Sequence, residues 1–200
     1  MNDPTTAEVP GGHRPAGDIG GVGDIGGHRF AGDIGDIHVV LVGLMGAGKS
    51  TVGNVVAARL GRELVDSDTR IEGRAGRTVK EILAANGVEA LRRHESDALF
   101  DALAEGTPRV IAAAGGVVLD PAHRRRLIRS GAFVVWLDAD PRLLVPRALT
   151  RTHRPWLDDD PVGTLDRMHR ERSPLYGEVA SLIVTVDGLT PEQIADRIVP

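Results

Sequence analysis

From His38 onward, short apolar runs alternate with stretches whose apolar residues recur at helical spacing. The run at 38–42 is apolar and β-branched, as expected for a strand that is buried on both faces. Residues 49–60 carry small and apolar side chains at helical spacing and end at Gly61. The same patterns predict strands at 63–65, 110–113, 132–137 and 181–186, and helices at 88–103, 121–129, 141–149 and 162–175. Capping boxes at Thr78/Glu81 and Thr190/Gln193 mark two more helix starts. This alternation predicts an α/β fold with a parallel sheet and helices on both faces.

The first 37 residues differ in composition from the rest. They hold 10 of the 25 glycines, and the segment at 11–20 returns nearly unchanged at 26–35. With so much glycine and so few large apolar side chains, the entropy cost of ordering this stretch exceeds what burial returns. We therefore expect a disordered, low-complexity tail at 1–37 and a folded domain at 38–200. His13 and His28 could suggest a metal-binding segment, but two histidines so far apart in a flexible chain make a poor metal site.

The net charge of −4 is not evenly distributed. Residues 1–37 contain six acidic and two basic side chains, so residues 38–200 are balanced. This charge gives no reason to expect nucleic acid or an anionic membrane as a partner. The longest apolar runs are far shorter than a bilayer span, no secretory signal pattern opens the chain, and cysteine is absent. We expect a cytoplasmic protein without disulfides.

The segment Gly43-Leu44-Met45-Gly46-Ala47-Gly48-Lys49-Ser50 matches the phosphate-binding P-loop pattern, and it lies between a predicted strand and a predicted helix. In such a loop, glycines let backbone N–H groups turn toward phosphate, and the helix N-terminus favours negative charge. Lys49 would reach the β- and γ-phosphates of ATP, and the Ser50 hydroxyl would hold Mg²⁺. The expected nucleotide contacts are Gly46, Ala47, Gly48, Lys49, Ser50 and Thr51.

Three further segments are candidates for the site that receives the phosphoryl group. Asp66-Ser67-Asp68 follows the second predicted strand. On an extended segment its two carboxylates are expected to point the same way. One could reach the water shell of the metal, and the other could accept a proton from the acceptor hydroxyl. Asp68 could instead cap a helix at 69–75. Arg92-Arg93 lies on a predicted helix, where it could equally form a solvated face. Ala114-Gly115-Gly116 permits close approach of a ligand to the backbone, or it is a plain turn.

Taken in order, these segments resemble the shikimate kinase family. The resemblance runs from about His38 to Val199 and rests on the P-loop, Asp66–Asp68, Leu91-Arg92-Arg93, Ala114-Gly115-Gly116, Arg154-Pro155-Trp156-Leu157 and Arg172-Ser173-Pro174-Leu175-Tyr176. It implies a three-layer P-loop kinase fold with a five-stranded parallel sheet, a substrate-binding helical region and a mobile lid. It also implies a monomer that transfers the γ-phosphoryl group of ATP to the 3-hydroxyl of shikimate, the fifth of seven steps to chorismate.

The resemblance also implies residue roles. Lys49, Asp68 and Arg154 would be catalytic, with Asp68 binding the shikimate hydroxyl as candidate base and Arg154 closing from the lid. Asp66 would lie near Mg²⁺ with Ser50, and Arg147 near adenine. The acceptor would contact Asp68, Gly115 and Gly116, with its carboxylate held by Arg92 and Arg172. Planar guanidinium groups suit a carboxylate better than lysine does.

The chain departs from the family pattern at three positions. Ala114 stands where a third glycine is usual, Trp156 replaces a lid leucine, and Ser67 replaces threonine. Two of these changes lie on the acceptor side, which leaves open a paralogous kinase acting on another polyhydroxy acid or a cyclitol. A nucleotide-binding regulatory protein is a further alternative, although such a protein has no use for Asp68 as a base or for a lid arginine.

Overall fold

The computed structural model describes residues 34–149 and 160–200, which form one parallel sheet with helices around it. The sheet has five strands in the order β2-β3-β1-β4-β5. Their bounds are β1 Val39–Val42, β2 Leu64–Asp66, β3 Val110–Ala112, β4 Phe133–Asp138 and β5 Leu182–Thr185. The helices are α1 Lys49–Leu60, α2 Ser67–Ala75, α3 Val79–Leu103, α4 Pro121–Arg129, α5 Pro141–Leu149, α6 Pro161–Val179 and α7 Pro191–Ile198.

The central strand β1 is inaccessible to solvent along its whole length, as its apolar, β-branched sequence predicts. It pairs in parallel with β3 on one side and β4 on the other, so that Leu41 lies between Ala112 and Val135. Because the pairings are parallel, the carboxyl ends of these strands meet at one edge of the sheet. Open α/β sheets bind their ligands at this edge.

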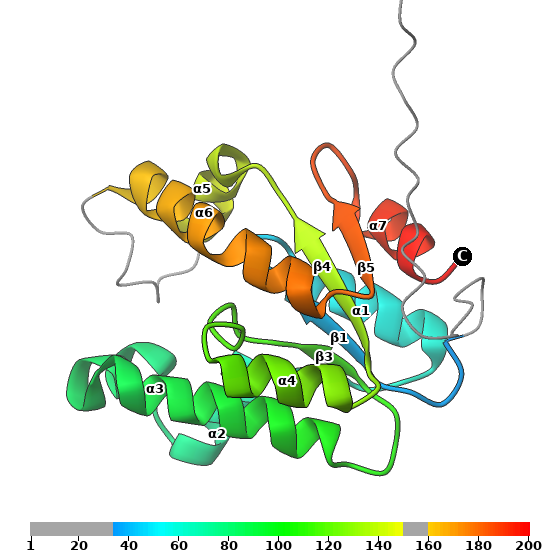
Figure 1. Ribbon diagram of the computed structural model, residues 1–200, viewed down its shortest axis with the longest axis horizontal. Helices are drawn as coiled ribbons and strands as arrows, with labels where there is room; N and C mark the ends of the chain where they lie inside the picture. The colour runs from blue at the N-terminus through cyan, green and yellow to red at the C-terminus, as the bar shows by residue number, and fades with distance from the viewer. Residues whose placement is uncertain (1–33, 150–159) are drawn as a thin grey trace, which may run out of the picture.

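Helices cover both faces of the sheet, which confirms the predicted three-layer arrangement. In Figure 1, α4 and α6 lie on one face, and α1 and α7 lie together on the other. The helix α2 and the first part of α3 stand to one side as a small lobe, whereas Leu99, Phe100 and Ala102 near the end of α3 belong to the main core. Ile71, Ile82, Leu91 and Ala98 of this lobe form an apolar cluster separate from the main core.

Three helices, at 49–60, 121–129 and 141–149, begin and end where the sequence predicts. Both predicted capping boxes are present, at Thr78 and Thr190. The helix that Thr78 starts continues into the one predicted at 88–103, with a break at Gly87, whose φ of 77° and ψ of 175° are not helical. The helix expected at 162–175 runs from Pro161 to Val179. The lid segment that the resemblance implies, Arg154-Pro155-Trp156-Leu157, lies outside the described residues.

The packed domain begins earlier than the boundary expected after residue 37. Ile34 is 7% exposed and belongs to the main core. Arg62 donates hydrogen bonds to the carbonyls of Ile37, at 2.7 Å, and Gly35. Residues 34–37 therefore belong to the folded domain and not to the expected tail, because Ile34 finds a buried position. In the described part of the chain, no helix is long and apolar enough to cross a membrane.

Candidate active site

The P-loop connects β1 to α1 at the carboxyl edge of the sheet. Gly48 precedes α1 with a φ of 90°, and no described side chain caps this helix end. Gly43 has a φ of 142°, and a Cβ atom there would lie 2.6 Å from the Leu137 carbonyl oxygen. Glycine is therefore required at both positions for the loop to turn tightly. The first turn of α1 contains no acidic residue, so the helix dipole favours an incoming phosphate.

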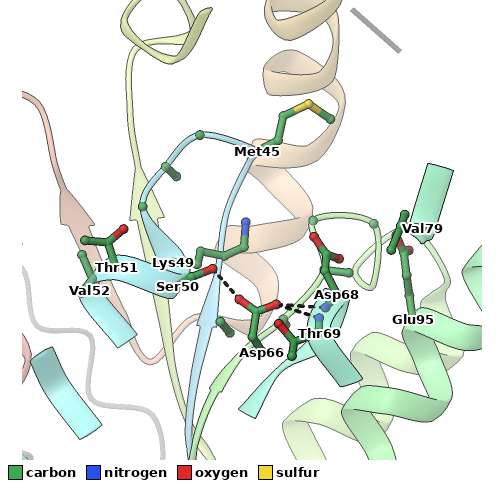
Figure 2. Close-up of a pocket in the computed structure, with 18 of the residues that line it drawn as sticks. Met45, Lys49, Ser50, Thr51, Val52, Asp66, Asp68, Thr69, Val79 and Glu95 are labelled. Carbon is green, nitrogen blue, oxygen red and sulfur yellow. Dashed lines mark hydrogen bonds between the residues drawn. The ribbon is translucent and has the colours of Figure 1, made fainter. Parts of the chain in front are cut away.

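Lys49 extends from the first turn of α1 over this loop. Its Nζ donates hydrogen bonds to the carbonyl oxygens of Gly43, at 2.9 Å, and Leu44, at 3.0 Å. Figure 2 shows its ammonium group pointing into the cleft beside the loop. The positive charge is thus placed where the β- and γ-phosphates of a bound nucleotide would lie.

Asp66 ends β2 and connects the P-loop to α2. The Ser50 hydroxyl donates to one of its carboxylate oxygens, and the other accepts the backbone N–H groups of Asp68, at 3.0 Å, and Thr69, at 3.3 Å (Figure 2). Asp66 is therefore the cap of α2, and the alternative that Asp68 caps a helix at 69–75 is wrong. The expectation of two carboxylates on one extended segment is also wrong, because Asp68 already lies in the first helical turn.

The adjacent oxygens of Ser50 and Asp66 fit Mg²⁺. Both are hard oxygen donors, and Mg²⁺ is usually held by one or two carboxylates or hydroxyls together with water and substrate phosphates. The hydrogen bonds that Asp66 accepts from the α2 backbone fix its orientation.

Asp68 points into the same cleft from α2 and is exposed to solvent (Figure 2). The cleft measures about 1260 Å³. Every predicted site residue that the structure describes contributes to its wall: the P-loop residues Gly46–Thr51, Asp66, Asp68, Arg92, Gly115, Gly116, Arg147 and Arg172. Arg154 and Trp156 lie outside the described residues. Arg93 is exposed and does not line the cleft, so of the arginine pair only Arg92 belongs to it.

Arg92 forms an ion pair that the sequence interpretation missed. Its Nη1 lies 2.5 Å from a carboxylate oxygen of Glu95, one helical turn further along α3. Glu95 is 8% exposed, and burial raises its pKa above the ordinary glutamate value, with Arg92 acting in the opposite direction. The spacing of three residues was the only signal in the sequence, and most such pairs lie on a helix surface. Here the buried carboxylate orients the guanidinium at the cleft wall.

The second predicted arginine, Arg172, reaches the cleft from α6. It is 7% exposed, its Nη1 donates to the Gly115 carbonyl at 3.3 Å, and its Nε is buried without a partner among the residues the structure describes. A Cβ atom on Gly116 would overlap the guanidinium of Arg92. The two glycines therefore lie packed between two guanidinium groups, an arrangement suited to an anionic, planar ligand group.

Comparison with known proteins agrees with this geometry. The family model described as shikimate kinase matches residues 45–200. The chain belongs to the shikimate kinase family. A shikimate kinase from Symbiobacterium thermophilum is 42% identical over 165 residues, which cover 81% of this chain and 94% of the relative. A shikimate kinase from Thermobifida fusca is 41% identical and covers 80% of this chain and 91% of the relative.

Solved structures extend the similarity to three dimensions. A shikimate kinase from Acinetobacter baumannii in complex with shikimate superposes with a TM-score of 0.78 at 32% identity, covering 82% of this chain and 92% of that one. A gluconokinase from Sinorhizobium meliloti matches with a TM-score of 0.58 at 21% identity, covering 82% and 94%. At that identity the second likeness shows the fold alone.

Proposed function

We propose that this shikimate kinase family member transfers the γ-phosphoryl group of ATP to the 3-hydroxyl of shikimate, with the residue roles set out below. The observation that carries the proposal is the composition of one cleft. A P-loop forms one part of its wall, and two arginines on either side of a diglycine form another. A phosphate donor and a carboxylate-bearing acceptor would therefore meet in a common space, with Asp68 facing it.

On the donor side, the backbone of the P-loop and the N-terminus of α1 bind the phosphates, and Lys49 exchanges its carbonyl contacts for the β- and γ-phosphate oxygens. Ser50 and Asp66 are the residues that would hold Mg²⁺, which offsets negative charge on the phosphate oxygens when it is bound. Arg147 lines the same cleft and is assigned to adenine binding.

On the acceptor side, Arg92 and Arg172 hold the shikimate carboxylate and so set the position of its ring. Asp68 accepts the proton of the 3-hydroxyl while that oxygen attacks the γ-phosphorus, and ADP leaves with the electrons of the broken P–O bond. Arg154 is assigned to stabilising the charge of the transferring group. We propose further that the enzyme is a cytoplasmic monomer and that residues 1–33 form a tail outside the catalytic domain.

The test is an ATP-consumption assay with shikimate, quinate, gluconate and a neutral cyclitol as acceptors. We expect turnover to be highest with shikimate and lowest with the cyclitol, because a neutral ring leaves two guanidinium groups in the cleft without an anion. Faster turnover with the cyclitol than with shikimate would overturn the proposal in favour of the paralogous kinase.

A further inference from the structure

Tyr176 is the only tyrosine in the chain, and none of the roles above uses it. It lies on α6 one turn after Arg172 and is 1% exposed. Its hydroxyl donates a hydrogen bond of 2.7 Å to the carbonyl oxygen of Gly115, 61 residues away in the sequence. Its ring lies 5.7 Å from that of Trp136, on β4, which holds it against the sheet.

The accepting carbonyl belongs to the peptide bond between Gly115 and Gly116. The described backbone contains no cis peptide bond, so the Gly115 carbonyl and the Gly116 N–H point in opposite directions from one rigid plane. Neither glycine has a side chain to restrict the rotation of this plane. A contact that fixes the carbonyl on the α6 side therefore also fixes the N–H on the opposite side.

We propose that Tyr176 is a positioning residue for the acceptor: it locks the Gly115–Gly116 peptide so that the backbone facing the cleft keeps the orientation that binds shikimate. This inference rests on the proposed function, since it assumes that shikimate is the acceptor. The same carbonyl accepts the longer, 3.3 Å hydrogen bond from Arg172, so this carbonyl connects Tyr176 with a guanidinium that is assigned to the substrate carboxylate.

Two properties of the site support this role. Burial raises the pKa of Tyr176 to about 12, so its hydroxyl keeps its proton and remains a donor at every pH at which the enzyme would work. Arg172 and Tyr176 lie four residues apart on one helix face, so α6 presents the substrate-binding guanidinium and the donor to the glycine turn as one rigid unit.

The test compares Tyr176→Phe with a matched control, Ser130→Ala. The control also removes a hydroxyl that donates to a backbone carbonyl, that of Leu127 at 2.6 Å, but it lies at the end of α4, among residues that do not line the cleft. We expect Tyr176→Phe to raise KM for shikimate roughly tenfold, the effect of losing one hydrogen bond, with KM for ATP unchanged. Ser130→Ala should lower Tm without changing either KM. A fall in Tm in both variants with KM for shikimate unchanged in both would overturn the proposal.

A single tyrosine also permits a measurement on the intact enzyme. Replacing it with 3-fluorotyrosine during expression keeps the hydroxyl and gives one ¹⁹F resonance. We expect this protein to keep a near-normal KM for shikimate, and its resonance to shift on addition of shikimate but not of Mg²⁺-ADP. If Tyr176→Phe does not fold, the labelled protein provides the test of the proposal. An unchanged ¹⁹F resonance on addition of shikimate would then overturn it. Wild-type protein that fails to phosphorylate shikimate would overturn the proposed function instead, which keeps the two failures distinct.

Discussion

The two sides of the cleft differ in how they would recognise the anions assigned to them. The phosphate side is one continuous segment, in which the proposed binding groups are backbone N–H groups and a helix end, with Lys49 adding a single charge. The acceptor side is assembled from side chains on α2, α3 and α6 around a turn after β3, where buried Glu95 orients Arg92 and buried Tyr176 binds the turn. A backbone site needs only the right local conformation, whereas a side-chain site needs correct packing between distant elements.

The largest effect should come from the phosphate side. Lys49→Ala removes the only cation that the first turn of α1 places at the loop, and we expect kcat with shikimate to fall about 10³-fold. Turnover should be lost equally with every acceptor, because the donor is common to all of them. Binding of shikimate alone, followed by calorimetry, should remain. Preserved turnover would mean that the phosphates bind elsewhere.

Asp68→Asn should have the next largest effect. The amide keeps the shape of the side chain but cannot accept the proton, so we expect kcat to fall about 10²-fold while KM for ATP stays constant. Steady-state kinetics over both substrates checks this. Activity equal to that of the wild type would remove Asp68 from the mechanism and leave the acceptor hydroxyl without a base.

Glu95→Gln tests whether a buried partner sets the acceptor affinity. It weakens the 2.5 Å ion pair with Arg92, and we expect KM for shikimate to rise roughly fivefold. Glu178→Gln is the matched control, because Glu178 pairs with Arg124 at 2.6 Å outside the residues that line the cleft. An equal response of the two variants would show that the Glu95 pair has no special role in binding.

Glu95→Gln should also change how the free energy of unfolding depends on pH. Because burial raises the pKa of Glu95 in the folded protein, the stability that this raised pKa contributes is fully present below the ordinary glutamate value of about 4.3 and is lost as pH rises through the folded pKa. Relative to Glu95→Gln, the wild type should therefore gain stability as pH falls from neutrality toward that range. Denaturant unfolding at several pH values measures the difference, and a wild type that gains stability relative to Glu95→Gln as pH rises would contradict the assignment.

The smallest effects concern the N-terminal segment, whose described residues 34–37 do not line the cleft. Removing residues 1–33 should leave kcat, both KM values and Tm unchanged. Removing residues 1–37 also deletes the buried Ile34, and we expect it to lower the free energy of unfolding by about 2 kcal/mol with the kinetic constants intact. Ile34→Ala in the full chain should reproduce most of that loss, and an unchanged stability would show that this burial contributes little.

The sequence was sufficient where the determinants are local. The P-loop, the capping boxes and three helices with clear start and stop signals were predicted with their bounds. Asp66 was not predicted as the cap of α2, because the helix starts at Ser67, directly after β2, and not at Thr69 as expected. The ion pair of Glu95 and the contact of Tyr176 with Gly115 were missed for another reason. Burial and a contact spanning 61 residues are properties of the packed molecule that spacing along the chain does not reveal.

The apolar cluster of Ile71, Ile82, Leu91 and Ala98 has a consequence for the folding of the molecule. The end of α3 is anchored in the main core by Leu99, Phe100 and Ala102, whereas α2 and the first part of α3 are held by the smaller cluster. We therefore expect α2 and the first part of α3 to open at a lower free energy than the sheet, and their amide protons to exchange sooner. Arg92 follows Leu91 of this cluster directly. An acceptor that binds Arg92 on the lobe and Arg172 on α6 would connect the two units, and by mass action it would suppress the local opening. Substrate would then act as part of the tertiary structure that holds the lobe in place.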